Sequence, residues 1–139
     1  MYLLDTNVVS ELRRPKPHRG VAAWLESVPD EHLHLSAVTV GELQAGVEIT
    51  REQDSPKAEA IEAWIAQVEQ TWNVLTMDGR TFRVWARLMH RRPDELIEDA
   101  MIAATAIVHD LVVVTRKLRD FKPFGVKTLD PFAPQRGRR

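Results

Sequence analysis

Four acidic side chains lie where a divalent-metal site could be built, namely Asp5, Glu42, Asp99 and Asp120. Asp5 ends the apolar stretch 2–4, and Asp120 follows the largely β-branched run 111–115, so both can lie at the same edge of a sheet. If the four carboxylates converge, their mutual repulsion destabilises the fold unless a divalent cation lies among them. Mg²⁺ or Mn²⁺ held in this way activates water and neutralises charge that develops on a phosphate group. The residues alone predict an acidic site for a hard metal and do not identify a substrate.

Each of these carboxylates also has an ordinary structural interpretation. Asp5 can cap the helix that follows it, and Glu42 can be an exposed residue that complements a helix dipole. Asp99 is more informative, because it lies in the apolar segment 96–104, where an ionised carboxylate needs a compensating partner. The helix dipole compensates this charge only modestly, so we expect a metal ion or an arginine beside Asp99.

The composition restricts the metals that fit this chain. It contains no cysteine and five histidines, which excludes disulfides and thiolate metal sites and favours hard, oxygen-preferring cations. The histidines show no ligand spacing, although His32 and His34 share a strand face and leave a zinc site open as an alternative.

The charge distribution gives only local arguments for a nucleic-acid partner. Lys and Arg number 19 against 20 Asp and Glu, so the net charge of −1 provides no general attraction to RNA or DNA. Basic residues do gather in the segments 13–19, 83–92 and 116–119. Arg83, Arg87 and Arg91 share one predicted helix face, and they are candidates for contact with a phosphate backbone. The four tryptophans lie on apolar faces and are expected to anchor a core or an interface.

Strands and helices alternate along the chain, and this alternation places the carboxylates. Hydrophobic spacing predicts strands at 2–4, 33–36, 72–75, 111–115 and 126–129. Helices are predicted at 20–28, 57–69 and 95–109, and two more begin after Asn7 and after Asp78. A further helix is predicted to begin at a cap, either Ser36 or Thr39, and to end at about residue 49. The alternation favours an α/β fold with a parallel sheet between helices, whose ligands bind beyond the carboxyl ends of the strands.

The length of 139 residues fits one α/β domain. We expect a domain at 1–132 and a basic C-terminal tail at 133–139. The chain begins with a strand pattern and shows neither a signal-peptide pattern nor an apolar run of membrane-spanning length. We therefore expect a cytoplasmic protein without a membrane partner.

Four segments, taken together, resemble the motifs of PIN-domain toxins of the VapC type. The segments are LLDTNVVSE at 3–11, LSAVTVGELQAG at 35–46, DAMIAATA at 99–106 and VTRKLRDF at 114–121. They occur in the family's order and at family-like spacing, and the resemblance extends from residue 2 to about residue 132.

The resemblance implies a PIN-like three-layer α/β/α sandwich with a central, mainly parallel sheet. It also implies that Asp5, Glu42, Asp99 and Asp120 are the metal-binding and catalytic carboxylates, with Thr6, Asn7 and Thr115 as their hydrogen-bond partners. The expected activity is that of an Mg²⁺- or Mn²⁺-dependent endoribonuclease, the toxin of a toxin–antitoxin pair, which hydrolyses RNA phosphodiester bonds and leaves a 5′-phosphate and a 3′-hydroxyl. A homodimer and a small VapB-like antitoxin that blocks the active-site groove are the expected protein partners.

One residue departs from the family pattern. The fourth motif of the family usually reads Thr-Arg-Asn, and this chain has Lys117 where the asparagine would be. An ammonium group therefore replaces an amide. It could pair with a carboxylate or contact a phosphate, so we leave Lys117 out of the predicted metal ligands.

Two other classes of function are compatible with parts of this sequence. The first is a non-catalytic PIN-like module that binds RNA or an antitoxin and holds a metal only for structure; loss of one of the four carboxylates would favour it. The second is another magnesium-dependent α/β protein, such as a phosphoacceptor receiver or a haloacid-dehalogenase-like phosphatase. Those proteins need an acidic pair or Asp-x-Asp after the first strand, whereas here Asp5 is followed by Thr6 and Asn7.

Overall fold

The computed structural model describes residues 1–134, which form an α/β fold around one parallel sheet. Within these residues the strand order is β3-β2-β1-β4-β5, and every neighbouring pair is parallel. The strands are β1 (Tyr2–Leu4), β2 (Leu33–Ser36), β3 (Asn73–Leu75), β4 (Val112–Val114) and β5 (Thr128–Leu129). β1 lies at the centre, so its carboxyl end is flanked by those of β2 and β4.

The central strands send alternate side chains into two cores. Leu3 and Val113 are fully buried in the core on one face of the sheet, and Leu4 and Val114 are fully buried in the core on the other. Because both faces are covered, these strands consist of unbroken apolar residues rather than an apolar–polar alternation. The residue that follows each strand is thereby held at a fixed position at the sheet edge.

Helices connect the strands and cover both faces of the sheet. The longer helices are α1 (Thr6–Glu11), α2 (Arg19–Glu26), α3 (Ala37–Arg51), α4 (Ser55–Thr71), α5 (Gly79–Met89) and α6 (Ile97–His109). A short helix α7 (Leu118–Phe121) and the 3₁₀ segments η1 (Asp30–His32), η2 (Asp94–Leu96) and η3 (Lys122–Phe124) complete the described elements.

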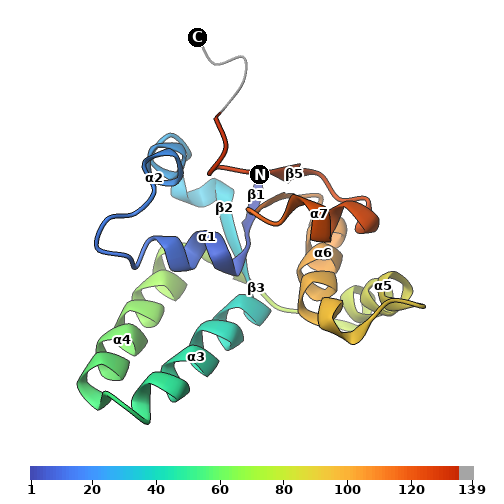
Figure 1. Cartoon of the computed structure of the whole chain (residues 1–139). Helices are drawn as coiled ribbons and strands as arrows, with labels where there is room; N and C mark the ends of the chain where they lie inside the picture. Colours follow the sequence, from blue (N-terminus) through green and yellow to red (C-terminus); the bar gives the residue numbers. More distant parts are fainter. Residues whose placement is uncertain (135–139) are drawn as a thin grey trace.

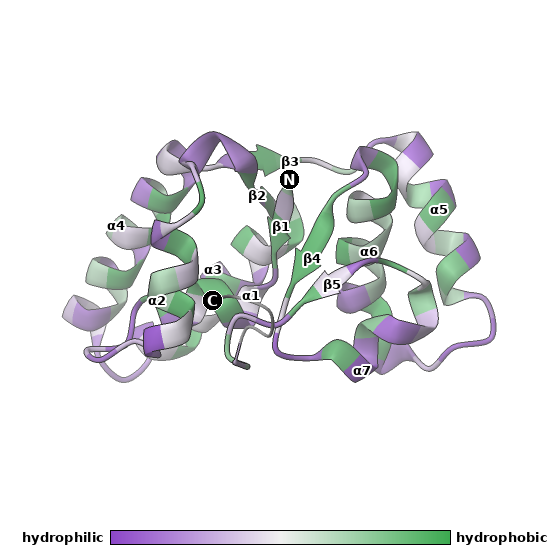
Figure 2. Cartoon of the chain, turned by 90° about the horizontal axis from the view of Figure 1, so that it is seen from above, coloured by the Kyte–Doolittle hydropathy of each residue, from purple (hydrophilic) through white to green (hydrophobic). Residues whose placement is uncertain are grey.

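The layers match the expected three-layer sandwich (Figures 1 and 2). Seen from above, α1 to α4 lie on one side of the sheet and α5 to α7 lie on the other. The long helices pair on each side, α3 with α4 and α5 with α6. The α3–α4 pair buries a separate small core that includes Val47, Ile61 and Ile65.

The predicted elements are all present, with shifted bounds. The last two strands are shorter than predicted, since the pairing covers only residues 112–114 and 128–129. Residues 94–96 form a 3₁₀ turn, so α6 begins at Ile97 rather than at Glu95. Within the described residues no helix is long and apolar enough to cross a membrane. Of the predicted basic tail, residues 135–139 lie outside the described part of the chain.

Candidate active site

Asp5 lies at the carboxyl end of β1 and is held there by three hydrogen bonds. Its Oδ1 accepts from the Thr6 backbone N–H at 2.8 Å. Its Oδ2 accepts from the Thr115 hydroxyl at 2.8 Å and from the Asn7 side-chain amide at 3.1 Å. Asp5 also caps α1, so the structural interpretation from the sequence is confirmed. The predicted hydrogen-bonding of Asn7 and Thr115 to this carboxylate is likewise confirmed.

The environment of Asp5 disfavours its ionised form. The side chain is buried, and this burial raises the pKa of Asp5 above 3.8. The hydrogen bond from Thr115 and the positive charge of Lys117 lower the pKa without restoring it, while the nearby charge of Asp99 raises it further. A buried carboxylate with this shift would be stabilised in its charged form by an added cation.

Glu42 reaches the same place from α3. Ser36 ends β2 and caps α3 by accepting from the Val38 N–H, which directs the first turns of the helix toward the end of β1. The Thr6 hydroxyl donates to Oε1 of Glu42 at 2.7 Å and is also hydrogen-bonded to the Thr39 hydroxyl at 3.0 Å. Partial burial raises the pKa of Glu42, and the charges of Asp5 and Glu98 raise it further.

Asp99 lies in the first turn of α6, the helix that covers the other face of the sheet. The residue is 8% exposed and is surrounded by apolar positions of the same helix. The indole N–H of Trp85 donates to the Ile97 carbonyl at 3.2 Å and ties the start of α6 to α5. The sequence predicted an arginine or a metal beside Asp99. The structure instead places Lys117 there, with its Nζ 2.9 Å from Oδ1 and 3.2 Å from Oδ2.

Asp120 has no direct contact with the other predicted carboxylates among the interactions of residues 1–134. It is half-buried in the short helix α7, and its side chain makes no hydrogen bond or ion pair with them in the described residues. Its charge does act on Lys117, which links it to the site electrostatically. Glu98 is a residue that the sequence did not single out, because it is exposed on α6 and precedes the conspicuous Asp99 by one position.

The donor set fits a hard divalent cation in its chemistry. Asp5, Glu42 and Asp99 supply carboxylate oxygens, and burial raises the pKa values of Asp5 and Glu42 by disfavouring their ionised forms. In residues 1–134, however, no three acidic or histidine side chains are close enough to hold a metal together. In the structure the positive charge beside Asp99 is instead the ammonium of Lys117.

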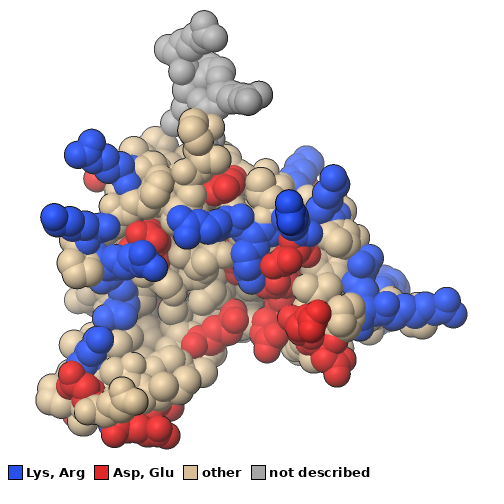
Figure 3. Space-filling model, viewed as in Figure 1, with Lys and Arg blue, Asp and Glu red and all other residues tan. Residues whose placement is uncertain are grey.

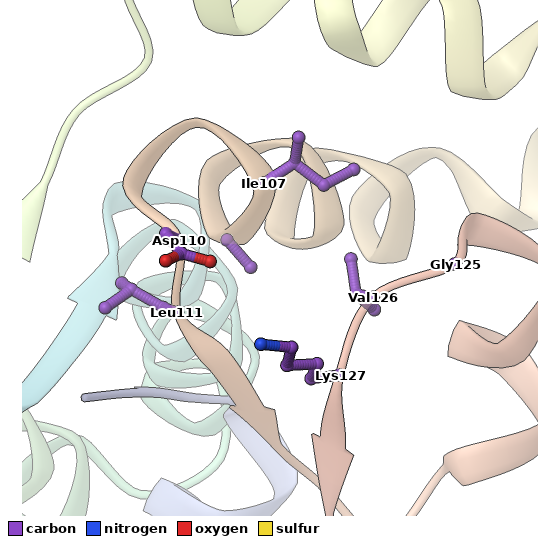
Figure 4. A pocket seen from close by; sticks show the side chains of 7 residues that line it. Ile107, Asp110, Leu111, Gly125, Val126 and Lys127 are labelled. Atoms are coloured by element: carbon purple, nitrogen blue, oxygen red, sulfur yellow. The ribbon is translucent and has the colours of Figure 1, made fainter.

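A hollow of about 230 Å³ adjoins Glu42 between α1, α3 and α4. Thr6, Glu42 and Arg13 line it together with apolar side chains that include Leu43 and Ile61. It continues toward a basic rim formed by Arg13, Arg14 and Lys57. A second hollow, of about 190 Å³, lies at the other end of the sheet between the end of α6 and β5, and Figure 4 shows the side chains that line it. That hollow contains none of the predicted site residues.

Acidic and basic side chains divide the surface above the site (Figure 3). On this face acidic groups gather near the middle, around the starts of α3 and α6, and basic groups lie above them as well as over the α1–α2 segment and over α5. Arg80, Arg83 and Arg87 line a shallow hollow of about 580 Å³ on α5. Arg91, predicted on the same helix face, is instead beyond the end of α5, and its φ of 63° is left-handed.

The four tryptophans pack in or against the cores, as the sequence predicted. Trp24 is buried in the core beneath α2, and Trp64, Trp72 and Trp85 are half-buried against the cores. Phe82, on α5, is 44% exposed.

Comparisons with known proteins agree on one family. The model of the PIN domain matches residues 2–122. The VapC ribonuclease Y4jK of Sinorhizobium fredii is 35% identical, over 96% of this chain and 99% of that protein. The toxin FitB of Neisseria gonorrhoeae is also 35% identical, over 95% of this chain and 99% of that protein.

Solved structures give the same result in three dimensions. A crystal structure of FitAcB from Neisseria gonorrhoeae contains a chain that matches 95% of this one, and 99% of that chain is covered, with a TM-score of 0.85 and 34% identity. A structure of FitAB bound to an IR36 DNA fragment matches with a TM-score of 0.86 and 31% identity, over 99% of this chain and 100% of that chain. With the fold, the sequence motifs and relatives that match over nearly their whole length, this chain belongs to the PIN-domain family, among toxins of the VapC type.

Proposed function

We propose that this chain is a divalent-metal-dependent endoribonuclease that acts as the toxin of a toxin–antitoxin pair. The observation that supports the proposal is a chain of hydrogen bonds at the carboxyl end of β1. Thr6 hydrogen-bonds to both Asp5 and Glu42, and Lys117 links Thr115, a partner of Asp5, to Asp99. The name of the relative Y4jK, a VapC ribonuclease, supports the same activity. The expected substrate is RNA, because the hollow beside Glu42 has a basic rim suited to phosphates.

The proposed metal ligands are Asp5 and Asp99, with Glu42 and Asp120 completing the site. A bound Mg²⁺ or Mn²⁺ would supply an activated water and neutralise negative charge on the phosphate. The chain's own part is to hold the ligand oxygens in place. Thr115 and Asn7 fix the Oδ2 atom of Asp5, while the Thr6 hydroxyl fixes Glu42. Hydrogen bonds of this kind orient metal-binding carboxylates.

The proposal includes partners. The related FitB chain is found in structures with FitA, one of them with DNA, so we propose that a small antitoxin binds this chain and blocks its site. We also propose a homodimer. Arg83 and Arg87 on α5 would extend the RNA contact away from the scissile bond, because both are exposed and neither is ion-paired within residues 1–134.

The test is cleavage of RNA by the purified chain in Mn²⁺ or Mg²⁺, beside an EDTA control and two aspartate variants. Asp99→Asn should abolish cutting and leave the circular dichroism spectrum unchanged, because it removes the charge and keeps the shape of the side chain. Asp110→Asn is the matched control. Asp110 is exposed beyond the end of α6 with a φ of 52°, a conformation that asparagine also tolerates. This control should cut RNA at the wild-type rate.

Retained cutting in Asp99→Asn would remove Asp99 from the mechanism. No cutting by a folded wild-type protein, in any of the metals, would favour the alternative of a non-catalytic module that binds RNA or an antitoxin. Hydrolysis of small phosphate esters in place of RNA would instead indicate a phosphatase.

A further inference from the structure

Lys117 is connected to two of the proposed metal ligands. Its Nζ donates to both carboxylate oxygens of Asp99, at 2.9 and 3.2 Å. Its backbone N–H donates to the Thr115 hydroxyl at 2.9 Å, and that hydroxyl in turn donates to Asp5. The backbone of Lys117 is therefore fixed by the same hydrogen bonds that orient Asp5, while its long side chain spans the gap to Asp99.

The two partners of this ion pair are unequally accessible. The side chain of Asp99 is 11% exposed and that of Lys117 is 43% exposed. Asp99 is fixed in the first turn of α6, whereas the lysine reaches it through four flexible methylene groups. The ammonium can thus leave Asp99 toward solvent, while the carboxylate cannot follow it.

The ammonium and a divalent cation would require the same oxygens. A group that donates to Oδ1 and Oδ2 together occupies the side of the carboxylate from which a metal would bind. A Mg²⁺ ion bound to these oxygens at about 2.0–2.1 Å would lie close to the positively charged ammonium, so the two cations would repel each other while Lys117 stays paired with Asp99. The acidic groups that face Lys117 are Asp99, Asp5 and Asp120, and its charge also reaches Glu42. Any cation that enters this group therefore competes with Lys117.

We propose that Lys117 is a tethered cation that competes with the divalent metal for Asp99, and so weakens metal binding relative to a neutral residue at this position. This inference rests on the proposed function, because it takes Asp99 to be a metal ligand. Lys117 is a positioning residue in this role: it holds Asp99 in the metal-free protein and must be displaced before a cation can contact both oxygens. The competition makes the site sensitive to the concentration of free divalent cation.

The test is direct Mn²⁺ binding to the full chain, followed by electron paramagnetic resonance of the free ion at constant ionic strength and without RNA. Lys117→Asn and Lys117→Met both remove the charge, and each should bind Mn²⁺ about three- to tenfold more tightly than wild type, the range for a partly buried ion pair. Lys117→Arg keeps a cation, so its affinity should stay closer to that of wild type. Lys127→Asn is the matched control, since Lys127 lines the hollow at the opposite end of the sheet.

The methionine variant separates competition from a gained ligand, because asparagine could bind the metal through its own carbonyl and methionine offers no oxygen. Tighter binding by Lys117→Asn alone would overturn the proposal, and so would unchanged or weaker binding by both neutral variants. Thermal unfolding provides a second measurement. The two neutral variants should be less stable than wild type in EDTA and should gain more stability from Mn²⁺.

Asp99→Asn distinguishes failure of this inference from failure of the proposed function. If Asp99→Asn loses Mn²⁺ binding while the lysine variants match wild type, only the competition is wrong. If Asp99→Asn binds Mn²⁺ as tightly as wild type, or if no protein in the series binds Mn²⁺, Asp99 is not a metal ligand and both are wrong.

Discussion

At the scale of single residues, the site combines buried charge with few compensating cations. Asp5 is almost completely inaccessible to solvent, yet it accepts hydrogen bonds from one backbone N–H and two side chains. These donors keep a buried carboxylate tolerable, because an unpaired buried charge would cost several kcal/mol, on the order of 3–5. Burial still raises the pKa of Asp5, so the donors offset the cost of desolvation only in part.

Substitution of Glu42 can measure how much a partly buried carboxylate charge destabilises the fold, with little change in the shape of the side chain. Glu42→Gln keeps an oxygen to accept from the Thr6 hydroxyl and removes the charge. The folded protein raises the pKa of Glu42 above 4.5, so it favours the protonated form. The contribution of Glu42 to the free energy of unfolding is therefore fully present below the pKa that Glu42 has in the unfolded chain. It is lost as the pH rises through the higher pKa of the folded protein.

Glu42→Gln should thus be more stable than wild type at neutral pH and equal to it below about pH 4. The gain in free energy of unfolding should be at most about 1 kcal/mol, because Glu42 is only partly buried and solvent still screens its charge. Urea unfolding in EDTA across this pH range measures the difference. If Glu42→Gln is less stable than wild type at pH 7, the ionised Glu42 carboxylate does not destabilise the fold. Added Mn²⁺ should stabilise the wild type more than the variant.

Sequence reasoning predicted where the carboxylates lie better than it predicted their partners. Asp5 could be placed because it follows an apolar strand, and Asp99 could be placed because it interrupts an apolar helix face. The partner of Asp99 was not predictable, since an exposed lysine chain can reach several carboxylates and the sequence left carboxylate and phosphate contacts open. Asp120 belongs to a short helix, α7, that the sequence did not predict, and its charge acts on Lys117.

At the scale of elements, the fold places the site through short, fully buried strands. The strands were readable because both faces of β1 and β4 are covered, which requires unbroken apolar residues. The bounds of the helices were less readable. α4 begins at Ser55 with Pro56 in its first turn and a cap from Asp54, two residues before the predicted start, because proline is well tolerated there. Segment 94–96 forms a 3₁₀ turn, and its hydrophobic spacing is too similar to that of an α-helix for the sequence to show that α6 begins only at Ile97.

Two helical glycines provide a test of how tightly these elements pack. A Cβ atom on Gly20, at the start of α2, would lie 2.8 Å from the Pro131 carbonyl oxygen, while a Cβ on Gly46, within α3, would meet nothing within 4 Å. Gly20→Ala should therefore destabilise the fold, by about 1–3 kcal/mol, because the backbone after β5 must move. Gly46→Ala should stabilise it by about 0.5–1 kcal/mol, because alanine favours the helix.

Urea unfolding of the two variants beside wild type measures both changes. Each variant adds one methyl group to a helix, so each serves as the control for the other. If Gly20→Ala gained stability as well, the segment around Pro131 would not be packed against α2 as the structure has it.

At the scale of the whole molecule, the net charge is small, but acidic and basic side chains gather in different places on the surface. The net charge is −1, but the face in Figure 3 has a group of acidic side chains near the middle, with basic side chains above it and on both flanks. A polyanion is repelled by the centre of this face and attracted to its flanks, so a bound RNA would be positioned by the flanks. α5 connects one flank to the site, because Trp85 on this helix holds the first turn of α6, where Asp99 lies.

The arginines of α5 should therefore contribute to RNA affinity without contributing to the chemistry. Replacing Arg83 and Arg87 together with alanine should weaken RNA binding and lower the slope of log affinity against log salt by about 2, one unit for each lost phosphate contact. The measurement is fluorescence anisotropy of a labelled RNA between 50 and 200 mM KCl, a range suited to counterion release, in the Asp99→Asn background, which prevents cleavage.

A control for the loss of charge is Lys127→Ala, because Lys127 lines the hollow at the opposite end of the sheet. If RNA binding depended only on the charge of the whole protein, this single variant would weaken it about half as much as the Arg83 and Arg87 pair. If it depends on the flank formed by α5, only the Arg83 and Arg87 pair lowers the salt slope. The local arrangement of charge would then account for RNA binding by a protein whose net charge is close to zero.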